Sequence, residues 1–183
     1  VSLDTADGTL TVLDRRARRQ WTQRSLGGEL LLQKVAATAN RIDFEFLPAP
    51  SGLDVTARLQ LEADRPEFTV TLQAEGPMPA TLAFPQPFAG APGDFLVVPM
   101  NEGISFPVDD PAISPLRLVA YGGHGICMAF WGLTDGAKGQ MAILETPDDA
   151  AIRIERLEKR LAIAPTWEAQ HGQFGYARRV RYV

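Results

Sequence analysis

The sequence predicts an all-β protein, a large antiparallel β-sandwich with little or no helix. Three observations support this fold class. Apolar and polar residues alternate with a period of two over most of the chain, which is typical of half-buried strands. Turn signals recur about every ten residues, as in sandwiches and barrels. The length of 183 residues fits one domain with a sizeable core.

The clearest strands are two neighbours in the middle of the chain. Between residues 53 and 63 the odd positions are apolar and the even positions are polar. After a short turn that contains Pro66, the alternation restarts and continues through residues 68–74. Two such strands joined by a short turn predict a hairpin with one face on the core and the other in water.

Other segments show the same alternation. Near the N-terminus, residues 2–5 and 9–13 flank a turn at Gly8, a residue that accepts a positive φ. Further strands are expected at residues 42–46, 125–131, 139–145, 151–157, 161–165 and 175–183. Residues 149–160 could also form a helix, but the alternation of Ile152 and Ile154 with polar neighbours favours a strand.

Two proline-containing passages interrupt the pattern. Residues 76–94 hold five prolines and predict a crossover or a sheet edge, since proline cannot donate to a ladder. Residues 96–110 hold Asn101, Glu102 and Gly103 between Pro99 and Pro107. We interpret this second passage as a short crossover loop at the rim of the sandwich.

Composition excludes several functions. The net charge of −4 argues against nucleic acid and anionic membranes as partners, and the run from Arg15 to Arg19 is expected to be a solvated hairpin tip. The one cysteine, Cys127, permits no intrachain disulfide and is expected to be buried and inert. Two histidines without a Cys/His cluster predict no zinc, and we expect no cofactor. Neither a signal peptide nor a long apolar run is present, so the sequence predicts no particular cellular compartment.

The domain organisation is predicted to be one β-sandwich domain, residues 1–183, without an internal repeat. The sequence starts at Val1 without a methionine and stops within an expected strand at Val183. We therefore expect the domain to come from a larger chain in which a catalytic domain follows.

Candidate catalytic groups are carboxylates and histidines. Glycoside hydrolysis needs two carboxylates at a fixed separation, and the acids at expected strand ends or turns are Glu102, Asp109, Asp110, Glu145, Asp148, Asp149 and Glu168. Spacing alone pairs no two of them, and turns are commonly acidic without catalysing anything. His124 and His171, with Glu102 or Glu145, could form an acid–base set for a sugar ring. Histidines of ordinary loops are the favoured alternative.

Aromatic residues could stack on a sugar face, and the candidates are Phe106, Tyr121, Trp131, Trp167 and Phe174. The alternative is that the tryptophans fill the core with their N–H groups satisfied. Core packing is favoured for Trp131, which lies within an expected strand, while the two alternatives are closer for Trp167.

Several short motifs together resemble the amino-terminal, galactose-mutarotase-like β-sandwich domain of certain multidomain glycoside hydrolases. They are Leu13-Asp14-Arg15-Arg16 with Trp21, Pro99-Met100-Asn101-Glu102-Gly103-Ile104, Phe130-Trp131-Gly132, Glu145-Thr146-Pro147-Asp148-Asp149-Ala150, Pro165-Thr166-Trp167 and Gly172-Gln173-Phe174-Gly175-Tyr176-Ala177-Arg178. The resemblance implies a supersandwich fold. It also implies that the catalytic carboxylates belong to a TIM-barrel domain outside this sequence.

The resulting functional hypothesis is a non-catalytic domain that packs on such a barrel and shapes its substrate cleft. A stand-alone sugar epimerase and a carbohydrate-binding module are the alternatives. The expected partners are a carbohydrate and the adjacent catalytic domain. Sugar contacts are expected from Asn101, Glu102, His124 and Trp167, and Glu102 and His124 are the candidate catalytic residues if the chain acts alone. We expect Glu102 to bind a hydroxyl group rather than to transfer a proton.

Overall fold

The computed structural model of the chain describes residues 1–27, 30–49, 51–123 and 125–183. Its strands are β1 (Ser2–Leu3), β2 (Leu10–Asp14), β3 (Arg19–Thr22), β4 (Leu30–Ala37), β5 (Arg41–Pro48), β6 (Val55–Leu61), β7 (Phe68–Ala74), β8 (Leu82–Ala83), β9 (Phe88–Ala89), β10 (Phe95–Val98), β11 (Ile104–Pro107), β12 (Leu116–Val119), β13 (Phe130–Thr134), β14 (Gly139–Leu144), β15 (Ala150–Leu157), β16 (Arg160–Trp167) and β17 (Arg178–Tyr182).

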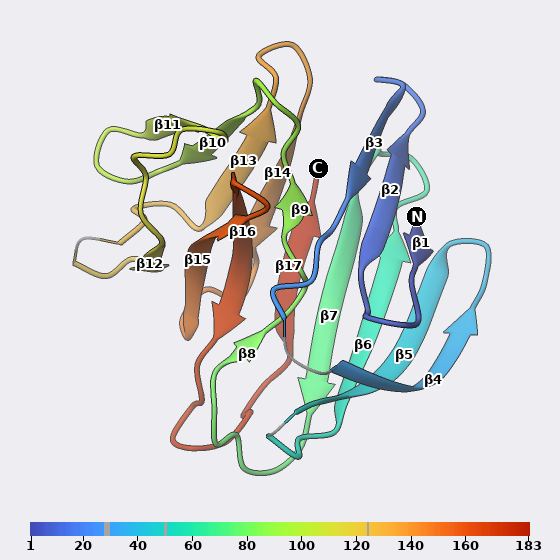
Figure 1. The fold of residues 1–183 in the computed structure, drawn as a ribbon. Coiled ribbons are helices and arrows are strands. Elements are labelled where there is room, and N and C mark those ends of the chain that lie inside the picture. Colours follow the sequence, from blue (N-terminus) through green and yellow to red (C-terminus); the bar gives the residue numbers. More distant parts are fainter. Residues whose placement is uncertain (28–29, 50, 124) are drawn as a thin grey trace.

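The strands form a two-layer antiparallel sandwich. One layer is a nine-stranded sheet in the order β11-β10-β13-β14-β17-β7-β6-β5-β4. The other layer consists of two smaller sheets, β1-β2-β3 and β12-β15-β16-β8, with β9 also paired to β16. Figure 1 shows these smaller sheets next to each other over the large one. The described residues contain no α-helix, which confirms the predicted fold class. None of their elements is a helix long and apolar enough to cross a membrane.

The two strongest patterns in the sequence are observed as hairpins. Strands β6 and β7 pair from Val55↔Ala74 to Leu61↔Phe68, and the alternating apolar side chains of β6 are buried. Strands β15 and β16 pair along their whole length around a turn at Glu158 and Lys159. Both turn residues have positive φ, 48° and 70°, the backbone that two-residue hairpin turns require. The helical alternative for residues 149–160 is therefore wrong.

The proline-rich segment of residues 76–94 carries the chain from the large sheet to the opposite layer, as predicted. Its short strands β8 and β9 pair with β16. Two of its aromatic residues enter the core between the layers. Phe84 packs on Phe46 with ring centroids 4.8 Å apart, and Phe88 meets Tyr182 edge-on at 5.4 Å. Such aromatic pairs add to the burial of apolar area, so this segment fastens the layers together.

The passage between Pro99 and Pro107 differs from its prediction. It is the turn and second strand of a hairpin, β10–β11, and not a crossover. Strand β11 lies at the edge of the nine-stranded sheet. An edge strand tolerates the missing N–H of Pro107, because the N–H groups on its free side have no ladder partner to lose.

Residues 125–129 do not form the expected strand, and β13 begins only at Phe130. Gly125 lies so close to the backbone of Val119 that a Cβ there would be 1.9 Å from the Val119 carbonyl oxygen. The N–H of Ile126 donates to the Val119 carbonyl (3.0 Å), and that of Cys127 donates to the Pro99 carbonyl (2.9 Å). These bonds hold the segment as a loop, and Cys127 is exposed instead of buried.

Candidate functional site

The turn of the β10–β11 hairpin carries two of the predicted site residues, Asn101 and Glu102. Asn101 has a φ of +53°, a conformation that asparagine accepts more readily than most residues, and Gly103 follows with +95°. The side chains of Asn101 and Glu102 are exposed. Glu102 makes no side-chain hydrogen bond and no ion pair with any described residue. Its carboxylate is therefore accessible to an external hydrogen-bond donor.

A neighbouring loop is joined to this turn. The thiol of Cys127 lies 2.9 Å from the Pro99 carbonyl oxygen and 3.6 Å from that of Asn101. The loop also presents Tyr121, which is 63% exposed and has a φ of +55°, and the exposed Met128. We call residues 99–103, 120–123 and 125–129 the rim loops. They combine a free carboxylate, an amide and an exposed aromatic ring, the groups that bind sugar hydroxyls and sugar faces.

The structure describes only part of the predicted acid–base set. His124 lies outside the described residues. Glu145 is held by Arg181 at 2.5 Å and by Arg179 at 3.2 Å, in the ion pairs beside β14 and β17. No hydrogen bond or ion pair within the described part of the chain joins Glu145 or Glu102 to His171.

Trp167 is placed in the core and not on a sugar-binding surface. Its side chain is 0% exposed, and its indole N–H donates to the Phe84 carbonyl oxygen at 2.7 Å. The other tryptophans, Trp21 and Trp131, are buried as well. The core-packing alternative therefore describes Trp167, and the buried ring presents no face to a sugar at the surface.

A polar cluster that the sequence reasoning missed surrounds Arg178. This side chain is 0% exposed, and it donates to the Asp149 carboxylate (3.0 Å) and to the backbone carbonyls of Glu168 (3.0 Å) and Phe174 (2.9 Å). Its guanidinium lies 3.7 Å from the centre of the Tyr176 ring. A signal for the burial existed, because in β17 Arg178 shares its face with Val180 and Tyr182.

The electrostatics of the cluster oppose proton transfer near neutral pH. Burial alone would raise the pKa of Asp149, but the hydrogen bonds from Tyr176 and Arg178 and the Arg178 charge outweigh it and lower that pKa. Burial, and then the hydrogen bond to Asp149, raises the pKa of the Tyr176 phenol. Near neutral pH, Asp149 is therefore ionised and Tyr176 is protonated.

The side chains whose positions are described were predicted to form no zinc site. Among them, no group of three or more His, Cys, Asp or Glu residues comes together in a way that could hold an ion.

The fold defines a structural class, the two-layer antiparallel β-sandwich. The chain resembles one portion of the α-N-acetylgalactosaminidase NagBb from Bifidobacterium bifidum. In its Gal-NHAc-DNJ complex the TM-score is 0.76 at 16% identity, over 100% of this chain and 34% of that chain. In its GalNAc complex the TM-score is 0.70 at 16% identity, over 100% and 36%.

A more distant likeness is to the Slr1438 protein from Synechocystis sp. PCC 6803, with a TM-score of 0.52 at 12% identity over 98% of this chain and 73% of that one. No protein-family model and no curated protein sequence matches the chain. At these identities the likeness establishes the fold. The chain spans about a third of the glycosidase, 34% of its length.

Replacing Asp149 with Asn tests the electrostatics of the Arg178 cluster. At pH 7 we expect Asp149→Asn to lower the free energy of unfolding by at least about 1.5 kcal/mol, because it removes a charged acceptor from a buried guanidinium. The folded-state pKa of Asp149 lies below its ordinary value of 3.8. The contribution is therefore fully present above that value and is lost as the pH falls through the folded-state pKa.

Urea unfolding of both proteins at several pH values between 7 and 3 measures this difference. It should be constant from pH 7 to about pH 5 and should shrink as the pH falls below about 4. Asp54→Asn, at an exposed carboxylate, is the control and should leave stability nearly unchanged. A deficit of Asp149→Asn that stays the same down to pH 3 would contradict the account.

Proposed function

We propose that this chain is a non-catalytic β-sandwich domain of a glycoside hydrolase. In this role it packs on a TIM-barrel catalytic domain and shapes the cleft in which that domain binds a carbohydrate. The observation that carries the proposal is the likeness of the entire chain to about a third of an α-N-acetylgalactosaminidase, 100% of one against 34% of the other. A fold that matches one part of a larger glycosidase, and matches it throughout, suits an accessory domain.

The chemistry of the described side chains agrees with a supporting role. Three of the candidate carboxylates, Glu145, Asp149 and Glu168, are paired with arginines. For Asp149 this pairing helps to lower the pKa, whereas a general acid at neutral pH needs a raised one. The candidate Glu102 stands free on the rim loops. A free carboxylate at a rim is suited to accept hydrogen bonds from sugar hydroxyl groups.

The rim loops are the part of the domain that we assign to the cleft. Tyr121 and Met128 expose apolar surface there, and Val119 does so beside them at the end of β12. Strands β11 and β12 are the outermost strands of their sheets. Exposed apolar groups beside unpaired sheet edges mark a surface that another body covers. With that surface against a catalytic domain, Asn101 and Glu102 would stand at the border of its cleft.

Separating the domain from a catalytic domain tests the proposed role. We expect residues 1–183 alone to hydrolyse no nitrophenyl glycoside. In a longer chain that contains these residues, their deletion should lower kcat/KM about tenfold or more, because the cleft loses the wall that positions the substrate. Activity of the isolated residues, or full activity after a clean deletion, would contradict the proposal. Circular dichroism of each truncated protein controls for folding.

Replacing Glu102 with Gln separates binding from proton transfer. In the same longer chain, we expect Glu102→Gln to raise KM about two- to tenfold, the effect of one weakened hydrogen bond, and to leave kcat unchanged. Glu75→Gln, at an exposed carboxylate outside the rim loops, is the matched control. A fall in kcat of about a hundredfold or more would instead identify Glu102 as the general acid or base.

A further inference from the structure

An open groove lies at one end of the sandwich, away from the rim loops. It has a volume of about 680 Å³ and runs between the tip of the β2–β3 hairpin and the turn that joins β6 to β7. This volume falls within the range of about 300–1,000 Å³ that is usual for ligand sites. Its lining includes the aromatic residues Trp21, Phe68 and Tyr182, and both Val1 and Val183 lie along it.

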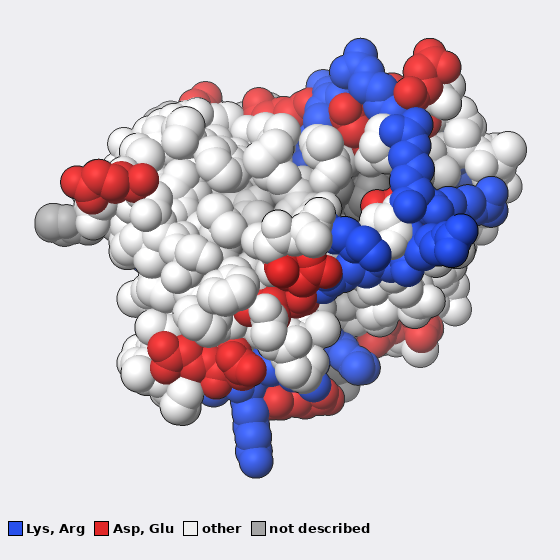
Figure 2. All heavy atoms as spheres, turned by 90° about the horizontal axis from the view of Figure 1, so that it is seen from above, with Lys and Arg blue, Asp and Glu red and all other residues white. Residues whose placement is uncertain are grey.

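Guanidinium groups stand on both walls of this groove. Arg15 and Arg16 come from the hairpin tip, and Arg65 comes from the β6–β7 turn. Figure 2 looks down on this end of the molecule and shows Lys and Arg side chains gathered over one side of it. This gathering of positively charged side chains contrasts with the net charge of the chain, which is −4.

Four arginines at or near the β2–β3 hairpin, two of them in the groove lining, differ from the others in making no polar side-chain contact with a described residue. Within the described part of the chain, the side chains of Arg15, Arg16, Arg18 and Arg24 make neither a hydrogen bond nor an ion pair, whereas every other arginine makes at least one. All four belong to the β2–β3 hairpin or to the residues next to it. Arg65 has only a long contact of 3.9 Å with Glu67.

The lining also holds three acids, which equal its three arginines in formal charge, but among the described residues none of these acids forms an ion pair with Arg15 or Arg16. The Asp14 carboxylate accepts hydrogen bonds from the backbone N–H groups of Arg16 (2.9 Å) and Ala17 (3.0 Å) and so fixes the turn. Glu67 is shared with Arg181, which lies 3.1 Å away. Asp64 is the remaining acid in the lining.

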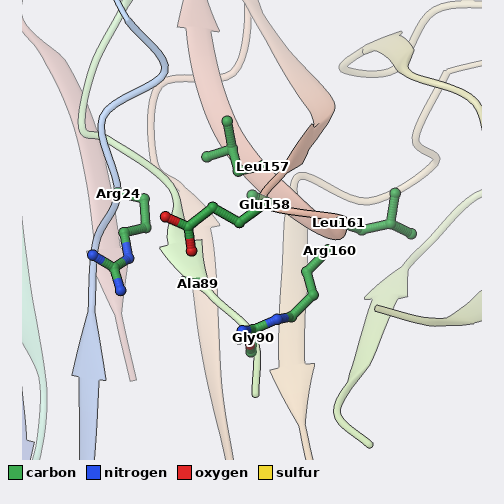
Figure 3. Close-up of a pocket in the computed structure, with 8 residues that line it drawn as sticks. Arg24, Ala89, Gly90, Leu157, Glu158, Arg160 and Leu161 are labelled. Atoms are coloured by element: carbon green, nitrogen blue, oxygen red, sulfur yellow. The ribbon is translucent and has the colours of Figure 1, made fainter. Parts of the chain in front are cut away.

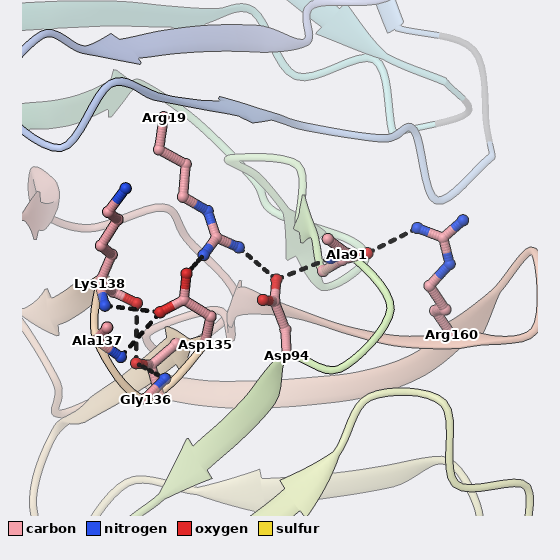
Figure 4. A network of polar contacts seen from close by, with 10 residues as sticks. Arg19, Ala91, Asp94, Asp135, Gly136, Ala137, Lys138 and Arg160 are labelled. Carbon is pink, nitrogen blue, oxygen red and sulfur yellow. Dashed lines mark hydrogen bonds and ion pairs between the residues drawn. The ribbon is translucent and has the colours of Figure 1, made fainter.

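The hairpin that carries the free arginines is held rigidly at its base. Arg19 pairs with Asp94 at 2.5 Å and with Asp135 at 2.7 Å, and its guanidinium lies 3.8 Å from the centre of the Trp21 ring. Figure 4 shows the two ion pairs, which connect β3 to the segment before β10 and to the β13–β14 turn. The Asp94 side chain is only 2% exposed. The backbone of the hairpin is thus anchored to two other segments at its base.

From these observations we infer that the groove is a binding site for an acidic saccharide, a sugar that carries a carboxylate or a sulfate group. Guanidinium groups bind planar oxyanions through paired, charge-assisted hydrogen bonds. Arginines on opposite walls can hold an anion between them, while the apolar lining contacts the ring. The anion follows from the groove itself, whereas the sugar body rests on the proposed function.

Calorimetric titration of the protein with three probes tests this site: a uronic acid disaccharide, the corresponding neutral disaccharide and sodium sulfate. The acidic disaccharide should bind, and more weakly as salt is added, while the neutral one should bind at least about tenfold more weakly. The double variant Arg16→Gln/Arg65→Gln removes one guanidinium from each wall and should weaken binding of the acidic disaccharide about tenfold or more.

The matched control is Arg18→Gln/Arg24→Gln, which removes the same charge from arginines outside the groove lining. Arg24 lines other cavities, one of them beside Glu158 (Figure 3). This control should retain binding within about twofold, since only screened long-range attraction is lost. Equal losses in both variants, or no binding to the unaltered protein, would overturn the site. Sulfate that binds as tightly as the acidic disaccharide would overturn the saccharide assignment. None of these outcomes affects the deletion test of the proposed function.

Discussion

The buried Arg178 guanidinium is the interaction on which the arrangement of the sandwich depends. Arg178 begins β17, which pairs with β14 on one side and β7 on the other. Its contacts reach the connection before β15 through Asp149 and the segment after β16 through the Glu168 carbonyl. A buried charge is very costly unless it is paired and hydrogen-bonded. Segments of both layers must therefore keep their positions together.

Arginines serve two different purposes in this protein, and burial separates them. Arg178 and Arg19 are enclosed, with side-chain exposures of 0% and 14%, and each joins separate elements through carboxylates. Arg15 and Arg16 are exposed at the hairpin tip and have no partner in the described residues. The same guanidinium group thus fixes the fold where carboxylates of the protein pair with it and remains available to a ligand where they do not.

The local strand pattern could be predicted because it depends on neighbours along the chain. Alternation placed β6 and β7 in one hairpin, and it favoured β15 and β16 over a helix. The errors lie where contacts between distant segments decide the outcome. Residues 125–129 are apolar enough for a strand, but Gly125 meets the Val119 backbone and Cys127 bonds to Pro99.

Candidate site residues were harder to predict than strands. Asn101 and Glu102 are exposed in a turn, as a polar Asn-Glu-Gly sequence indicates. Trp167 could not be assigned, because its burial depends on Phe84, a residue more than eighty positions away whose carbonyl binds the indole. The groove could not be predicted either, because distant segments of the chain, the β2–β3 hairpin and the β6–β7 turn, form its walls.

A double-mutant cycle on Arg178 and Asp149 tests the central structural claim most directly. Arg178→Met, Asp149→Asn and the double variant would be compared with the unaltered protein by urea unfolding at pH 7. Each single change breaks the pair by altering one of its members, and the double change alters both. The account predicts that the double variant loses less stability than the sum of the single losses, by at least about 1.5 kcal/mol. Single losses that add to within about 0.5 kcal/mol would contradict it.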